Sequence, residues 1–213
     1  MSSHSDLNPR RVPQQERGER RVATLLDAAA SVIGESGYEP ATMSAIAERA
    51  GACIGSLYQF FPNKGAIAQA LRTRYLQDLE ELWTPLEADA ADAPLEELIG
   101  RMVDSMIEFV DGHPAFLALL DAPSATRAPE AIRKILRRRV AGFFHARCPQ
   151  LSESRALELA VVTLAIMKAL NQLYAQASLQ ERRQYVPEFK KALFAYLSAR
   201  LDSAHLTEGE ENN

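Results

Sequence analysis

Apolar residues recur at intervals of three and four along most of the chain, the spacing of an amphipathic helix. A first helix is predicted from Arg17, with an apolar face formed by Val22, Leu25, Leu26, Ala29, Val32 and Ile33. Gly37 supplies the left-handed residue that ends it. Two short helices follow, one capped by Thr42 and one over 54–60. The second ends there because Pro62 disfavours helix in the residue before it.

The remaining two thirds of the chain shows the same periodicity. Asn63 caps a long helix, and proline in the first turn marks three more, at Pro94, Pro114 and Pro129. Ser152 opens a further helix, whose segment 156–174 is apolar on almost every side, which is typical of a helix buried on more than one face. A capping box at Ser178 and Glu181 begins the last one. About nine helices and no convincing strand predict an all-α fold.

This pattern divides the chain into four segments: a polar arm (1–16), a three-helix region (17–63), a larger helical region (64–205) and an acidic tail (206–213). No charge-free apolar run reaches the roughly 18 residues of a transmembrane helix, and the N-terminus lacks the apolar core of a secretory signal. Two cysteines form no disulfide framework. We therefore expect a cytoplasmic protein without membrane contact.

The net charge of −4 argues at first against nucleic acid, but its distribution is uneven. Residues 1–74 carry nine basic and seven acidic side chains, whereas the remainder carries 15 and 21. The basic excess at the N-terminal end permits a nucleic-acid partner there without proving one.

The segment 42–64 carries the most informative motif. Its two short helices, joined at 51–53, have the size of a helix-turn-helix, whose second helix enters the major groove. Gly55 and Ser56 are small enough to let a helix lie deep against base edges, and Tyr58 is able to donate to phosphate. Lys64 opposes the dipole of the helix that it begins. A phosphate bound at that helix N-terminus would account for this lysine.

This segment resembles the DNA-binding signature of the TetR family of bacterial regulators. The matching residues stand in one register without gaps: Thr42, Ile46, Ala47, Ala50, Gly51, Gly55, Ser56, Leu57, Tyr58, Phe61 and Lys64. The resemblance implies that Thr42, Tyr58 and Lys64 bind phosphate. It also implies that base edges are faced by Ser44, Ile54, Gly55, Ser56 and Gln59.

The resemblance further implies a homodimer, formed by pairing of the two C-terminal helices, on a pseudo-palindromic DNA operator. Family members are usually repressors released by a small molecule bound in the helical domain. Two alternatives stay open: an activator or effector-independent regulator, and a helical ligand-binding or interaction protein that no longer binds DNA. Cys53 stands where a serine usually caps the recognition helix, and a thiol is a weak acceptor, so we expect a cap weaker by ~0.5–1 kcal/mol. A redox role for this cysteine also stays open.

Several side chains of the larger region are candidates for lining an effector cavity: Met102, Met106, Phe109, Phe116, Phe143, Met167, Asn171 and Tyr174. Methionine and phenylalanine at helical spacing also form ordinary cores. Asn171 is polar within an apolar helix, which fits an effector contact, a bond across the dimer or exposure to water. The basic run 132–139 fits a solvated helix face or an acidic ligand.

Enzyme chemistry is not indicated. The four histidines are isolated, and the chain has no HExxH motif, no paired cysteine site and no glycine-rich phosphate loop. We expect no catalytic activity, no metal and no cofactor.

Overall fold

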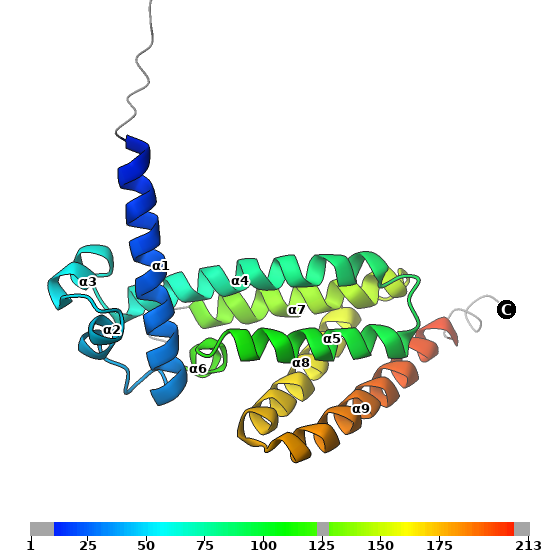
Figure 1. Cartoon of the computed structure of the whole chain (residues 1–213). Coiled ribbons are helices and arrows are strands. Elements are labelled where there is room, and N and C mark those ends of the chain that lie inside the picture. Colours follow the sequence, from blue (N-terminus) through cyan, green and yellow to red (C-terminus); the bar gives the residue numbers. More distant parts are fainter. Residues whose placement is uncertain (1–10, 123–127, 207–213) are drawn as a thin grey trace, which may run out of the picture. The chain divides into compact units, whose positions relative to one another are not determined.

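The computed structural model describes residues 11–122 and 128–206 (Figure 1). These residues form nine α-helices and no strand, which confirms the predicted all-α fold. The helices are α1 (Arg11–Ser36), α2 (Met43–Arg49), α3 (Ile54–Phe60), α4 (Lys64–Asp89), α5 (Leu95–Gly112), α6 (Phe116–Asp121), α7 (Ala128–Arg147), α8 (Glu153–Gln176) and α9 (Leu179–Leu206).

The described residues form two compact units. One, here called the head, contains 11–73 and Pro114–Ala122; the other, the body, contains 74–113 and 128–206. The sequence-based division fell at 63/64, so it differs from this one by the first turns of α4 and by the segment that returns to the head with α6. Ile67 and Leu71 of α4 are fully buried and extend the apolar face of the head.

Helix α1 begins at Arg11, six residues before the predicted Arg17. Part of the segment expected to be a polar arm is therefore helical. Pro13 does not interrupt the helix, because it lies in the first turn, where proline is tolerated. The rest of that arm, 1–10, and all but one residue of the predicted tail lie outside the described residues. At its other end α1 stops as expected, because Gly37 has φ of +85° and donates its N–H to Ile33 O at 2.8 Å.

The first three helices share one apolar core. α1 packs on α2 and α2 on α3. Leu25 and Ile33 of α1, Ile46 of α2 and Leu57 of α3 are fully buried. The predicted caps are confirmed: Thr42 Oγ1 accepts from Ala45 N at 3.1 Å, whereas Cys53 makes no side-chain bond to α3.

Two close contacts hold the Pro114–Ala122 segment within the head. A Cβ on Gly34 of α1 would lie 2.6 Å from Pro114 Cβ, so only glycine permits this approach. Arg72 Nη2 of α4 donates to Leu119 O of α6 at 3.2 Å. Arg72 is only 8% exposed, and this burial lowers the pKa of its guanidinium.

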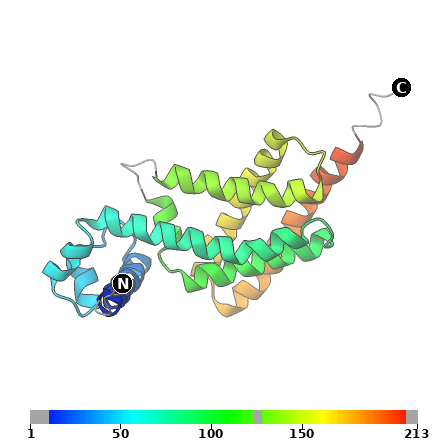
Figure 2. The ribbon, with the colours of Figure 1, turned by 90° about the horizontal axis from the view of Figure 1, so that it is seen from above.

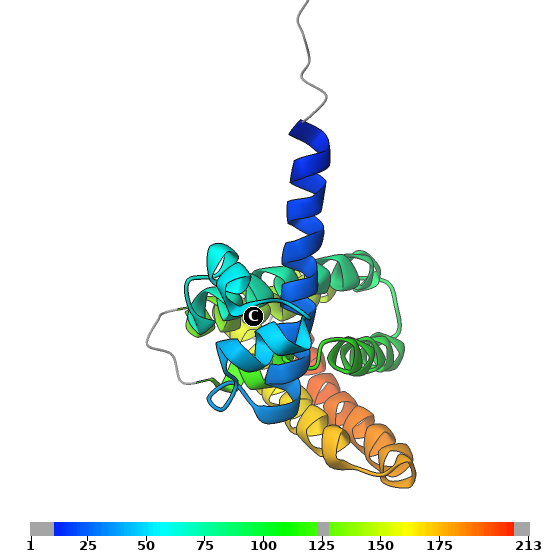
Figure 3. The same ribbon diagram turned by 60° about the vertical axis from the view of Figure 1, so that its left-hand side comes forward.

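The body is built from the rest of α4 with α5, α7, α8 and α9. α8 packs on both α7 and α9, and α5 packs on α9 (Figures 2 and 3). Trp83 of α4 meets Phe143 of α7 edge to face at 6.1 Å, and both are buried. By length and composition alone α8 is also apolar enough to cross a membrane, but a helix buried between neighbours has the same composition.

An ion pair on the head predicts how its stability depends on pH. The two terminal nitrogens of Arg49 each donate to one carboxylate oxygen of Glu35 at 2.7 Å, and the Ser31 hydroxyl donates to the same carboxylate at 2.9 Å. These bonds favour the ionised carboxylate and lower the pKa of Glu35 from 4.5 to about 2.

Because the folded-state pKa lies below the unfolded one, Glu35 stabilises the head fully above about pH 4.5 and less as the pH falls toward 2. We expect Glu35→Gln to lower the free energy of unfolding at neutral pH and to make its fall between pH 4.5 and 2 smaller. Urea unfolding across this pH range measures the free energy of unfolding. Glu39→Gln, which removes an exposed carboxylate of the same unit, is the control. Equal pH profiles for Glu35→Gln and the unmodified protein would contradict the assignment.

Candidate nucleic-acid interface

Helix α3 buries one side and exposes the other. Leu57 is fully buried and Phe61, directly after the helix, is 7% exposed, so the α3 backbone is fixed against the head. The exposed side chains of the helix include Ile54, 41% exposed, and Tyr58, 52% exposed. α3 thus exposes large apolar and aromatic side chains to solvent, although its inner face is fully packed. This exposed surface is what a recognition helix requires.

The structure brings the predicted DNA-contacting residues together on α2, α3 and the adjoining turns. Thr42, Ser44, Gly55 and Gln59 are exposed, like Ile54 and Tyr58, whereas Ser56 is half-buried. A Cβ at Gly55 would meet nothing within 4 Å, so glycine leaves open space at this point of the surface. The Thr42 oxygen accepts the capping bond from Ala45, so its O–H remains able to donate to a phosphate.

Lys64 has partners that the sequence did not reveal. Its Nζ donates to Tyr38 O at 2.7 Å and to Glu39 O at 2.8 Å, and it lies 4.5 Å from the centre of the Tyr38 ring. These bonds connect the start of α4 to the turn after α1. They explain, without a phosphate, why a lysine stands at a helix N-terminus. An ammonium has three donors, so one is left for a phosphate oxygen. The phosphate role of Lys64 stays a prediction.

The basic side chains of the head fall into two groups. Arg49 is engaged with Glu35, and Arg72 is buried. Arg17 and Arg20 on α1 are exposed, and Arg20 lies 3.8 Å from Glu16, a weak surface pair. Arg17 and Arg20 are thus exposed cations in the N-terminal half of α1, and arginine side chains of this kind contact DNA phosphates.

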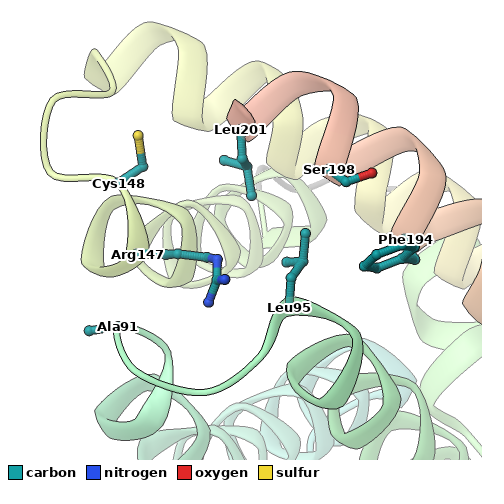
Figure 4. A pocket seen from close by; sticks show the side chains of 7 residues that line it. All are labelled: Ala91, Leu95, Arg147, Cys148, Phe194, Ser198 and Leu201. Carbon is teal, nitrogen blue, oxygen red and sulfur yellow. The ribbon is translucent and has the colours of Figure 1, made fainter. Parts of the chain in front are cut away.

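The residues predicted to line an effector cavity do not all fall in one unit. Phe116 belongs to the head, and Tyr174 in the body is only half-buried, with its hydroxyl 3.4 Å from Asp111 Oδ2. The others are buried in the body: Met102, Met106, Phe109, Phe143, Met167 and Asn171. Burial alone fits a packed core equally well. A cleft in the body is lined by none of them (Figure 4).

Some buried polar atoms inside the body have no hydrogen-bond partner among the described residues, including Trp83 Nε1 on α4 and, on α8, Thr163 Oγ1 and Asn171 Oδ1. These three side chains are at most 3% exposed. Asn171 was singled out from the sequence because it is polar in an apolar helix, whereas Trp83 and Thr163 were missed. No group of three or more histidine, cysteine, aspartate or glutamate side chains suited to a metal occurs in the described part of the chain.

Two family models match this chain. Residues 25–71 match the model described as bacterial regulatory proteins, tetR family, and residues 94–197 match the tetracyclin repressor-like C-terminal domain. This chain belongs to the TetR family. The matched residues include the whole helix-turn-helix and most of the body, so the resemblance found in the sequence is confirmed.

Among curated relatives, the TetR-family chain is similar to the A-factor receptor protein of Streptomyces griseus. The two are 36% identical over 86 residues, 40% of this chain and 29% of the relative. The transcriptional repressor KstR of Mycolicibacterium smegmatis is 43% identical over 64 residues, 30% of this chain and 31% of the relative. The chain therefore spans about a third of the length of these relatives.

Among solved structures, AibR in complex with isovaleryl coenzyme A and operator DNA has a TM-score of 0.64 with 20% identity. The match covers 82% of this chain and 98% of AibR. At that identity the likeness shows a shared fold, which extends over nearly the whole of AibR.

The geometry of Tyr58 and Lys64 predicts that their substitutions have different effects. We expect Tyr58→Phe to leave the free energy of unfolding unchanged, because the hydroxyl is exposed, and to weaken binding to all DNA sequences without changing its salt dependence. Lys64→Met should destabilise the head by about 1–2 kcal/mol, because two charge-assisted bonds are lost. If Lys64 also contacts phosphate, the slope of log affinity against log salt should fall by about 0.9.

Urea unfolding and DNA affinity at several salt concentrations separate these effects. Lys134→Met, which removes an exposed cation of the body, is the matched control for the salt slope. A slope unchanged by Lys64→Met would restrict Lys64 to its structural bonds. A large loss of stability in Tyr58→Phe would contradict the exposed position of that hydroxyl.

Proposed function

We propose that this TetR-family protein is a cytoplasmic, homodimeric and sequence-specific DNA-binding transcriptional regulator. In this proposal it is a repressor, without catalytic activity, that a small-molecule effector releases from its operator. The observation that carries it is the exposed face of α3, with Ile54, Gly55, Tyr58 and Gln59 outward and Leu57 anchored in the core. Small and hydrogen-bonding side chains on this face allow close approach to base edges in the major groove.

Exposed apolar side chains on α8 support the dimer. Val161 is 44% exposed, Val162 38% and Leu173 46%, all on a helix that is otherwise packed against α7 and α9. Large apolar side chains left exposed on a helix that is otherwise packed are typical of a surface that another protein covers. Pairing of α8 and α9 with the same helices of a second copy would bury them in a four-helix bundle. Two heads related by a two-fold axis then require a pseudo-palindromic operator.

The partnerless polar atoms in the body support an effector site there. A buried donor or acceptor without a partner costs about 1–3 kcal/mol, and most such groups in proteins are satisfied. Trp83 Nε1 is a donor, Asn171 Oδ1 is an acceptor and the Thr163 hydroxyl is both. We propose that these three side chains bind a polar group of the effector, with Met167, between the two α8 residues, covering its apolar part. The A-factor receptor protein is named for a ligand, and AibR, a structure of similar fold, is in complex with isovaleryl coenzyme A.

Selection of bound fragments from random duplex DNA tests the DNA-binding function. We expect an inverted-repeat consensus, bound tightly and with strong salt dependence by the dimer. Tyr58→Phe should bind the selected fragment more weakly while keeping the same consensus. Weak binding to every sequence by a folded, dimeric protein would instead favour the interaction protein that no longer binds DNA.

Isosteric substitutions on α8 test the effector site. Thr163→Val and Asn171→Leu remove partnerless polar atoms while keeping volume, so we expect each ligand-free variant to unfold at the same or a higher temperature than the unmodified protein. In a thermal-shift screen of acyl coenzyme A esters, compounds that stabilise the unmodified protein should stabilise the variants less.

The same compounds should release the selected DNA from the unmodified protein and not from Asn171→Leu. The coupling required is of order 1–3 kcal/mol, a 5- to 150-fold change in operator affinity. Full release from Asn171→Leu at unchanged compound concentration would remove this residue from the effector site without affecting the DNA-binding proposal.

A further inference from the structure

The body contains a cleft that the proposed function does not use. It has a volume of about 270 Å³ and lies among the segment joining α4 to α5, the end of α7 and the C-terminal half of α9 (Figure 4). It shares no residue with the three partnerless polar atoms assigned to the effector. Sites for drug-sized ligands occupy roughly 300–1,000 Å³, so this cleft suits a smaller molecule.

Apolar side chains from two helices form part of the cleft wall. Leu95 of α5 and Leu201 of α9 line it from two helices, and Phe194 of α9 adds an aromatic ring that is 37% exposed. Figure 4 shows these three side chains around the same space as the Arg147 guanidinium, while the Cys148 thiol and the Ser198 hydroxyl turn away from it. The cleft therefore presents polar surface that includes one charged group, with three apolar side chains beside it.

Arg147 has hydrogen-bonding capacity that the protein leaves unfilled. It is half-buried at the end of α7, and Nη1 donates to Ala93 O at 2.5 Å. A guanidinium carries five N–H donors, and no carboxylate among the described side chains forms an ion pair with it. Arg139, two turns earlier on α7, shows the contrast, because it is paired with Glu87 at 2.5 Å and Glu80 at 3.2 Å. A partly buried cation has lost part of its hydration, and a direct hydrogen bond to an anion stabilises it more than a bond to a neutral group.

We propose that this cleft binds a small monocarboxylate with an apolar body. Arg147 donates to the carboxylate oxygens, and Leu95, Phe194 and Leu201 cover the hydrocarbon part. One guanidinium balances one negative charge, so a carboxylate fits better than a phosphate dianion, whose second charge would meet no second cation in the cleft lining. The site is separate from the effector site and does not depend on the protein binding DNA.

Titration calorimetry with 3-phenylpropionate on the full-length protein tests the site, with the neutral 3-phenylpropan-1-ol as the matched probe. We expect the acid to bind and Arg147→Gln to weaken it about 10- to 100-fold, as for a lost charge-assisted hydrogen bond. Arg138→Gln, an exposed arginine on the same helix, should bind the acid as the unmodified protein does. The alcohol should bind weakly, and equally to the unmodified protein and Arg147→Gln.

A second pair of variants leaves Arg147 intact. Ala91 is exposed and lines the same cleft, so Ala91→Glu places a carboxylate where it competes with the probe, whereas Ala91→Gln fills the same volume without charge. We expect Ala91→Glu to abolish binding of the acid and Ala91→Gln to retain it. Asn171→Leu, in the proposed effector site, should bind the acid normally.

Four outcomes would overturn the proposal. They are no measurable binding of the acid, equal affinity in Arg147→Gln, equal loss in the two Ala91 variants, and loss of the acid in Asn171→Leu, which would place the probe in the effector site. Circular dichroism and urea unfolding of each variant identify any that does not fold, and the Ala91 pair still decides the question if Arg147→Gln is unstable.

Discussion

The apolar core shared by α1, α2 and α3 is the constraint on which the interface depends. Isolated helices shorter than about 12–15 residues are marginal in water, and α2 and α3 have seven residues each. Tertiary packing has to hold them, and Leu25 and Ile33 of α1 with Ile46 and Leu57 supply it, all at 0% exposure. The dependence is greatest for α3, because its N-cap Cys53 gives no side-chain bond. Its first turn is held by backbone bonds from Ser56 N and Leu57 N to Cys53 O, at 3.0 and 3.3 Å. The surface that faces DNA in our proposal is thus ordered mainly by burial on the opposite side of the same helix.

Features set by neighbouring residues could be predicted from the sequence. The caps at Thr42, Ser152 and Ser178 were predicted, because a hydroxyl reaches an N–H only three residues away. Contacts between distant residues could not be predicted in this way. The acceptors of Lys64 lie 25 and 26 positions earlier, and that of Arg72 lies 47 positions later. The packing of Pro114–Ala122 in the head depends on the space beside Gly34. A glycine within a helix does not indicate in the sequence which segment packs against it. The early start of α1 was missed because Pro13 and its polar neighbours have the composition of a flexible arm as well as that of a first helical turn.

The two candidate sites differ in how far the sequence could define them. A seven-residue helix that buries Leu57 leaves few positions for its outer face, so the pattern placed Gly55 and Ser56 away from the core, whereas Ile54 and Gln59 came from the resemblance to the family. In the body, a buried methionine or phenylalanine gives the same sequence pattern whether it belongs to a core or lines a ligand site. A buried polar atom without a partner distinguishes a ligand site from a core. The sequence indicates such an atom only when the residue is polar by type, as Asn171 is. Trp83 was missed because its large apolar surface makes it a core residue in any pattern, and the missing partner of its Nε1 is a property of the folded structure.

In the regulation proposed above, a ligand bound in the body alters the head, and the effect is carried where the chain passes between the two units. The described chain passes between the units after Thr73 and after His113, and it leaves the head again after Ala122. On the head side of the first two passages, Arg72 of α4 donates to Leu119 O. On the body side, Asp78 of α4 lies 3.0 Å from His113 Nε2, and His113 also stacks on Phe109 at 3.9 Å. α4 is therefore joined to the 113–119 stretch on both sides of the boundary. Within the body, a displacement of α4 relative to α5 would have to break the Asp78–His113 bond or carry His113 with it.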